Sequence, residues 1–102
     1  MIAVVAVITA KPGQRAALLE AFHANVPAVR AEAGCLEYAG AIDADGFSFA
    51  APMGADTFVV LEKWADGDAL RAHARAPHMA AYAAATKELV ANRMIHVLAP
   101  AD

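Results

Sequence analysis

The segment over residues 2–9 constrains the fold more than any other part of the chain. It reads IAVVAVIT, is rich in β-branched residues and is apolar up to Thr9, so both faces of a strand built from it are apolar. Lys11, Pro12 and Gly13 follow and end the strand. Such a strand is covered on both faces in a folded protein. A chain of 102 residues can cover one face with its own helices, so a second copy is the simplest cover for the other.

Composition favours association and argues against several kinds of partner. Hydrophobic residues make up 60% of the chain, more than one small core can bury, and the formal net charge of −3 gives no reason to bind nucleic acid. No apolar run reaches the roughly 18 to 20 residues that span a bilayer, and residues 1–10 lack the basic start of a signal peptide. The single cysteine, Cys35, fits a reducing compartment and is interpreted as a small buried hydrophobe. We therefore expect one cytoplasmic domain over residues 1–102 that forms a homodimer and has no membrane or nucleic-acid partner.

A first helix is predicted after the opening strand. Apolar side chains recur there at helical spacing, namely Leu18, Leu19, Phe22, Val26 and Val29. Pro12 suits the first turn, which gives a helix of roughly 20 residues. Pro27 lies inside this pattern and is predicted to bend or break the helix, and Gly34 is predicted to end it.

Two more strands are predicted over residues 35–42 and 57–64. Strict alternation in the first of them places three residues on one face, namely Leu36, Tyr38 and Gly40. Tyr38 is interpreted there as a sheet-packing residue. The connection over residues 43–55 has turn-forming residues on both sides of an FSFAA segment. It is predicted to carry a short hairpin extension and is a candidate lid.

The strand over residues 57–64 places a carboxylate, Glu62, on the same face as Trp64. An unpaired carboxylate is costly to bury, so we expect Glu62 to meet a lysine, an arginine, a histidine or backbone donors, either within the chain or across a subunit boundary. His73 is one candidate partner.

The remaining elements complete a fold prediction. Asp66 or Asp68 can cap a second helix, which Pro77 interrupts before a further helical run over residues 78–90. A last strand is predicted over residues 93–98. The order strand, helix, strand, strand, helix, strand is that of a split βαβ arrangement. We therefore predict an α+β, ferredoxin-like protein with one antiparallel sheet and helices on one face only.

The passage from Glu62 to Tyr82 gathers most of the polar aromatic side chains of a chain otherwise dominated by Ala, Val and Leu. These side chains are the best candidates to contact a small molecule. His73 is interpreted as a base or a phenolate anchor, because histidine changes charge between about pH 5 and 8. A structural histidine in the core or at its rim is the alternative. Tyr82 is interpreted as a catalytic hydroxyl donor or as packing, and Trp64 as a pocket wall or a core anchor.

Four more side chains complete the predicted substrate-binding set, namely His78, Met79, Phe22 and Arg93. His78 follows Pro77 at a helix start, where a structural role is the alternative. Arg93 could neutralise an anionic substrate or form an ion pair. The sequence has no nucleophile with a base at fixed spacing, no Gly-rich phosphate loop and no metal-ligand cluster. We therefore predict no metal and no bound cofactor.

An ordered set of short motifs resembles the antibiotic biosynthesis monooxygenase domain family, which belongs to the dimeric α+β barrel superfamily. The set consists of Lys11-Pro12-Gly13, residues 32–38, Glu62-Lys-Trp64, Leu70, His73, Pro77-His78 and Tyr82. The resemblance implies a dimeric α+β barrel in which each protomer holds an apolar pocket between sheet and helices. It also implies quinol monooxygenase chemistry, because some members oxygenate quinols or polycyclic phenols without metal or flavin.

Relatives on this fold also degrade haem, isomerise lactones or sense small molecules, so fold alone does not settle function. The haem-degrading branch uses an Asn on the first strand, a Trp on the second helix and a His further along. This chain has no Asn in residues 2–9, has His73 at the place of that Trp and has Ala83 near the place of that His. The sequence therefore favours a cofactor-independent monooxygenase that oxidises a quinol or polycyclic phenol to a quinone with dioxygen. A non-enzymatic binding or sensing module and a lactone-type isomerase are the alternatives.

Overall fold

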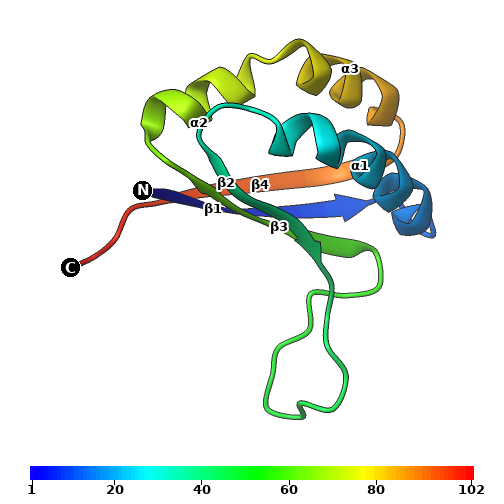
Figure 1. The fold of residues 1–102 in the computed structure, drawn as a ribbon. Helices are drawn as coiled ribbons and strands as arrows, with labels where there is room; N and C mark the ends of the chain where they lie inside the picture. The colour runs from blue at the N-terminus through cyan, green and yellow to red at the C-terminus, as the bar shows by residue number, and fades with distance from the viewer.

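The structure, a computed structural model, describes residues 1–102 as one antiparallel sheet with helices on one of its faces (Figure 1). The strands are β1 (Ile2–Ala10), β2 (Cys35–Ala41), β3 (Thr57–Trp64) and β4 (Val90–Leu98), in the sheet order β2-β3-β1-β4. The helices are α1 (Arg15–Arg30), α2 (Gly67–Ala74) and α3 (Pro77–Thr86). This arrangement confirms the predicted α+β, ferredoxin-like fold. No helix has the length and apolar character needed to cross a membrane.

The core lies between the helices and the sheet. Val4, Ala6 and Ile8 alternate along β1 and are buried on the face toward the helices. Phe22 of α1 packs there with ring centroids 5.4 Å from Phe58 and 5.5 Å from Tyr38. Gly40 lets this ring approach β2, because a Cβ at this position would lie 3.1 Å from Cε2 of Phe22. The aromatic cluster fixes α1 over β2 and β3.

The opposite face of the sheet has no helix over it (Figure 1). Val5 pairs with Leu61 and Val7 pairs with Met94, so these four side chains share that face. Leu61 is 41% exposed and Met94 is 52% exposed. Both faces of β1 are therefore apolar, as the opening segment predicted, but the chain covers only one of them.

The predicted first helix is wrong at its start and in the effect of Pro27. Residues 11–13 form a turn before α1, in which Gly13 has φ +77° and its N–H donates to the Asp56 carboxylate. α1 begins only at Arg15 and then continues through Pro27 to Arg30. Pro27 removes one backbone donor but still accepts a hydrogen bond from the N–H of Ala31, so the last turn closes.

The predicted second strand begins at Cys35 as predicted, but a bulge near its start and its last residue differ from prediction. Cys35 pairs with Trp64 and Glu37 with Lys63, so Leu36 is an extra residue in a bulge. The bulge moves Leu36 off the face of Tyr38 and leaves it exposed, while Cys35 packs partly buried against the core. β2 ends one residue earlier than predicted. Gly34 does not end α1, which stops at Arg30, but lies in the following connection with φ +82°.

The connection over residues 42–56 contains no strand, so the predicted hairpin extension is wrong. It has no neighbouring strand to pair with and projects from the sheet on the side away from the helices (Figure 1). Its two sides are joined by Asp43, whose carboxylate accepts hydrogen bonds from the N–H groups of Met53 and Gly54 at 2.8 and 2.9 Å. The segment is almost entirely exposed, and it lies away from the helices under which the chain's cavity is found.

The second half of the chain differs from prediction only at its last boundaries. Asp66 caps α2, accepting a hydrogen bond from the N–H of Ala69 at 2.8 Å. The break before Pro77 is present, but α3 ends at Thr86 rather than at residue 90. A turn closed by the N–H of Leu89 and the carbonyl of Thr86 leads into β4. β4 starts at Val90 because Val90 and Asn92 pair with residues of β1, and this pairing outweighs the local helical pattern.

Candidate functional site

His73 lies on α2 and is buried against two aromatic side chains. Its ring centroid is 4.6 Å from that of Trp64, with 34° between the ring planes, and it meets Tyr38 edge-on at 5.7 Å. The residue is 6% exposed. Trp64 at the end of β3 is fully buried. His73 thus belongs to one aromatic cluster with Trp64 and Tyr38, and this packing limits rotation of its ring.

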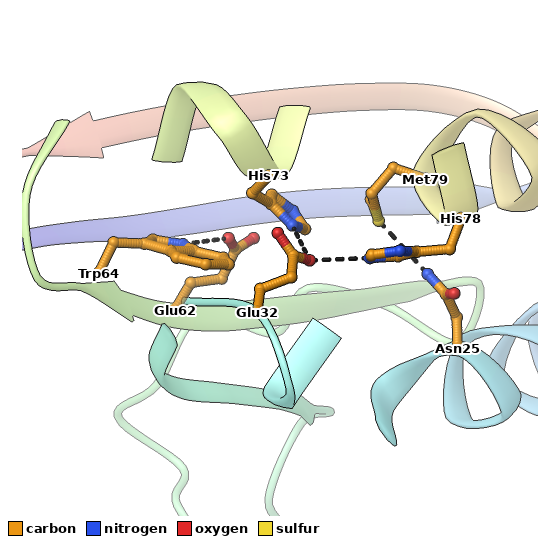
Figure 2. Close-up of polar contacts among 7 residues, drawn as sticks. All are labelled: Asn25, Glu32, Glu62, Trp64, His73, His78 and Met79. Carbon is orange, nitrogen blue, oxygen red and sulfur yellow. Dashed lines mark hydrogen bonds and ion pairs between the residues drawn. The ribbon is translucent and has the colours of Figure 1, made fainter. Parts of the chain in front are cut away.

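Two histidines share one carboxylate oxygen (Figure 2). Nδ1 of His73 lies 2.9 Å from Oε2 of Glu32, and Nε2 of His78 lies 2.8 Å from the same atom. Glu32 lies in the connection between α1 and β2, and its side chain is 13% exposed. An ionised carboxylate only accepts hydrogen bonds, so both nitrogens carry protons in this arrangement. In a neutral His73 the lone pair is then on Nε2.

Nε2 of His73 is available to a ligand. This atom makes no hydrogen bond within the chain, yet the chain has no side-chain nitrogen or oxygen that is both buried and unpartnered. Nε2 therefore reaches accessible space, and His73 lines the main cavity of the molecule. A histidine held at Nδ1 by a carboxylate, with Nε2 directed to a ligand, has the arrangement of a general base.

The cavity has a volume of about 570 Å³ and lies between the helix-facing side of the sheet and the helices α2 and α3. Its lining is mostly hydrophobic, as in other small-molecule sites. The lining includes several of the residues predicted from sequence, namely His73, Tyr82, Met79, Phe22 and Arg93. Trp64 and His78 are not in it. Trp64 packs behind His73, and His78 bonds to Glu32 instead.

Glu62 also lines the cavity, with a partner that differs from the predicted one. Its Oε1 accepts a hydrogen bond from the indole Nε1–H of Trp64 at 2.9 Å (Figure 2). No lysine, arginine, histidine or backbone group bonds to it, because His73 pairs with Glu32 and Lys63 points to the other face. Burial raises the pKa of Glu62, while the Trp64 hydrogen bond and the nearby His73 act in the opposite direction.

Two tyrosines bring hydroxyl groups to the same cavity. Burial raises the pKa of Tyr38 strongly, and the carboxylate of Glu62 adds to that effect. Burial also raises the pKa of Tyr82, and Arg93 partly offsets it. Both phenols therefore stay protonated at neutral pH and can donate hydrogen bonds to a ligand. Neither hydroxyl has a hydrogen-bond partner within the chain, and neither is sealed from accessible space.

One further contact fixes the α3 wall of the cavity. Met79 receives a hydrogen bond at its sulfur from Nδ2 of Asn25 at 3.3 Å, which joins α3 to α1 (Figure 2). No group of three or more His, Cys, Asp or Glu residues is arranged to hold a metal ion.

Sequence reasoning missed Glu32 and the cavity-lining role of Tyr38. Glu32 was part of the segment that carried the family resemblance, but an acidic residue just after a helix normally lies in solvent. Its bonds to His73 and His78 span 41 and 46 residues of sequence. Local spacing carries no signal for such contacts. Tyr38 was correctly placed in the sheet, and its alternation with Gly40 could have indicated that it faces the helices.

The fold and the cavity define a class of protein, a ferredoxin-like α+β protein with an apolar ligand site beside a carboxylate-bound histidine. The profile of the family described as antibiotic biosynthesis monooxygenase matches residues 1–85. The chain belongs to this family.

Individual proteins of known sequence or structure resemble it over nearly their full length. The chain is 42% identical to the probable quinol monooxygenase YgiN of Escherichia coli (strain K12), with 98% of each chain covered. Among solved structures, PA3566 from Pseudomonas aeruginosa has a TM-score of 0.81 and 31% identity, covering 99% of this chain and 94% of its own. Rv0793 from Mycobacterium tuberculosis has a TM-score of 0.80 and 32% identity, with 99% and 95% covered.

Proposed function

We propose that this protein is a cofactor-independent monooxygenase that oxidises a quinol or polycyclic phenol to a quinone with dioxygen. The observation that carries the proposal is the orientation of His73, with Nδ1 on Glu32 and Nε2 toward an apolar cavity. Membership of the antibiotic biosynthesis monooxygenase family supports it, as does the similarity to a probable quinol monooxygenase.

In the proposed reaction, Nε2 of His73 takes the proton of a phenolic hydroxyl. The resulting phenolate is electron-rich and passes one electron to dioxygen, and the radical pair combines to form a carbon–oxygen bond. The peroxide takes the proton back from His73, and the O–O bond then breaks. Loss of the ring hydrogen and hydroxide as water leaves the quinone. One oxygen atom of dioxygen ends in the quinone and the other in water, so the balance needs no other reductant. A phenol thereby gives the quinone, and a quinol gives the hydroxyquinone.

The remaining residues of the site would support this chemistry from fixed positions. Tyr82 donates a hydrogen bond to a developing negative charge on the substrate, and Arg93 adds a positive charge on the β4 side. Phe22 and Met79 form apolar walls that exclude water. Trp64 and His78 position His73 and Glu32 without lining the cavity.

The test is oxygen uptake by metal-free protein with a panel of hydroquinones and polycyclic phenols, followed by ¹⁸O₂ labelling of the product. His73→Asn should lower the turnover number about 10²- to 10⁴-fold, the usual contribution of a general base. His23→Asn, on the exposed side of α1, is the matched control and should leave turnover unchanged. Uptake no faster than the autoxidation blank across the panel would overturn the proposal.

Two other outcomes would assign the site differently. Tight ligand binding without oxygen uptake would indicate a binding or sensing module on the same cavity. Turnover that persists under anaerobic conditions would indicate an isomerase. Both outcomes contradict the monooxygenase proposal.

The proposal includes a homodimer formed through the helix-free face of the sheet. Leu61 and Met94 on that face are exposed and apolar, and β1 adds Val5 and Val7 between them. Burying such a patch against a second copy is favourable at about 25 cal/mol per Å² of apolar area. Sedimentation equilibrium should give twice the chain mass, and Leu61→Lys should shift the equilibrium toward monomer. A wild-type monomer at micromolar concentration would contradict this part of the proposal.

A cytoplasmic location, inferred from the single Cys35, remains part of the proposal.

A further inference from the structure

Glu62 presents an unused hydrogen-bond acceptor to the cavity. The residue is 8% exposed, and it lines the cavity from β3. Oε1 is held by the Trp64 indole, whereas Oε2 makes no hydrogen bond within the chain. Because no side-chain oxygen of the chain is both buried and unpartnered, Oε2 reaches accessible space. That space is the cavity, since the strand neighbours of Glu62 are buried residues of the sheet, Val4 and Tyr38.

The Glu62 carboxylate forms no ion pair within the chain. Lys63, its neighbour in sequence, forms an ion pair with Glu37 on the opposite face of the sheet. Arg93 lines the same cavity but is paired with Ile8, whereas Glu62 is paired with Val4. Ideal strand geometry separates these two positions by about 13 Å along the strands and about 10 Å across them. Glu62 and Arg93 therefore lie far apart in the lining, which also includes the exposed Arg75 at the end of α2.

A carboxylate oxygen of this kind selects for ligands by their hydrogen-bonding groups. It accepts a hydrogen bond from a hydroxyl, and the bond is strengthened by the charge of the acceptor and by the apolar surroundings. The oxygen of a quinone carbonyl or an aryl ether has no proton to donate, so the buried carboxylate would remain unsatisfied. A ligand carboxylate placed there would add repulsion between like charges.

We propose that Glu62 is a specificity residue, which accepts a hydrogen bond from a ligand hydroxyl and so selects uncharged hydroxyarenes over the matching quinones, aryl ethers and carboxylates. The inference deepens the proposed function and rests on it for the aromatic class of the ligand. Its chemical consequence is that the site favours the reduced substrate over the oxidised product. For a phenol substrate, whose product is a quinone without a hydroxyl group, product release is thereby assisted, because the quinone cannot replace the hydrogen bond that the phenol donates.

The experiment measures binding without oxygen, by calorimetry under argon, for three ligands on one scaffold. They are 1,4-dihydroxynaphthalene, 1,4-dimethoxynaphthalene and 1,4-naphthoquinone. The wild-type protein should bind the diol roughly 10- to 100-fold more tightly than either analogue, the range for a hydrogen bond to a charged group. Equal affinity for the diol and its dimethyl ether would overturn the inference without any variant.

A near-isosteric variant sharpens the test. In Glu62→Gln the amide oxygen can keep the Trp64 hydrogen bond, and the amide NH₂ then faces the cavity in place of Oε2. The preference should invert, with weaker binding of the diol and tighter binding of the quinone. An unchanged ratio of diol to quinone affinity in this variant would overturn the inference. Glu37→Gln, on the opposite face of the sheet, is the matched control and should keep the wild-type ratio.

The binding experiment separates this inference from the proposed function. Selective binding of the diol, together with oxygen uptake at the blank rate, would overturn the monooxygenase proposal and support the role of Glu62. Oxygen uptake without any preference for the diol would overturn only the role of Glu62. Glu62→Asp is the second variant in case Glu62→Gln does not fold, because aspartate keeps the charge. It should retain the preference for the diol over the ether. Loss of that preference would overturn the inference that the carboxylate charge selects the ligand.

Discussion

The two carboxylates of the site, Glu32 and Glu62, differ in their partners. Glu32 comes from a connection between elements and receives two imidazole donors on one oxygen. Glu62 comes from a central strand of the sheet and receives one indole donor, with its other oxygen directed to the cavity. Burial raises the pKa of Glu62 because its single donor does not compensate for lost hydration. The comparison indicates two different proposed roles, in which Glu32 orients His73 and Glu62 accepts a hydrogen bond from the ligand.

The largest effect on turnover is expected from a substitution of Glu32. Glu32→Gln keeps the shape of the side chain but removes the charge that holds and orients the His73 ring. We expect the turnover number to fall about 10²- to 10⁴-fold, by analogy with carboxylate-to-amide changes beside a catalytic histidine. Oxygen uptake at saturating substrate measures it. A variant within threefold of the wild-type protein would show that Glu32 is only structural, and Glu20→Gln, at an exposed position of α1, serves as the surface control.

A second change alters where Glu32 lies while leaving Glu62 in place. Gly34 has φ +82°, and a Cβ added there would lie 2.6 Å from Cβ of Ala69 on α2. Gly34→Ala should therefore lower the free energy of unfolding by about 2 kcal/mol. It should also lower turnover, because the connection that carries Glu32 shifts relative to His73. Urea denaturation and oxygen uptake together test this, and the ligand selectivity assigned to Glu62 should survive. Wild-type stability in this variant would mean that the contact relaxes without cost.

His78 offers a smaller test of the same carboxylate. His78→Leu removes one of the two donors to Glu32, so the carboxylate is less firmly held. Because His78 acts through Glu32, we expect a loss of about 10-fold in turnover with little change in KM. Combined with Glu32→Gln the two losses should not add, since both act on one contact. Additive losses would indicate that His78 contributes through another route.

The smallest expected effect concerns stability on the Glu62 side. The raised pKa of Glu62 means that the folded protein binds its proton more tightly than the unfolded chain does. The free energy of unfolding contributed by this group therefore falls as pH rises from about 4.3, the usual glutamate value, through the raised folded pKa. Glu62→Gln lacks this titration and should be more stable than the wild-type protein by about 1 kcal/mol at neutral pH, with a smaller difference at pH 4. Urea denaturation at both pH values measures the difference. A variant that is less stable at pH 7 would contradict the assignment.

Periodicity in the sequence was sufficient to predict the sheet and most of the helices. Alternation in residues 57–64 and the helical spacing of Leu18 and Phe22 each report on packing against a face, which is a local property of the chain. The boundaries that were wrong depend on contacts between distant segments. α3 gives way to β4 at Val90 because that residue pairs with Ala10, and Leu36 leaves its face because of a bulge against β3.

The candidate site was also predicted only in part, because some of its contacts join distant segments of the chain. His73, Tyr82 and Arg93 were singled out by residue type, and all three line the cavity. The carboxylate that orients His73 was not found, because nothing near residue 32 in the sequence indicates a histidine 41 residues away. The predicted partner of Glu62 was also wrong, because the donor is the indole of Trp64 and not a cation, a histidine or a backbone N–H. Residue types can be read from a sequence, whereas pairings across the fold require coordinates.

Trp64 is the only tryptophan of the chain, it is fully buried, and its ring is centred 4.6 Å from that of His73. Its fluorescence therefore comes from a single position in direct contact with the proposed base. Protonation of that imidazole, or arrival of a ligand beside it, should change the emission of this one indole. The protein thus carries an intrinsic optical reporter, through which site occupancy can be followed in real time without an attached label.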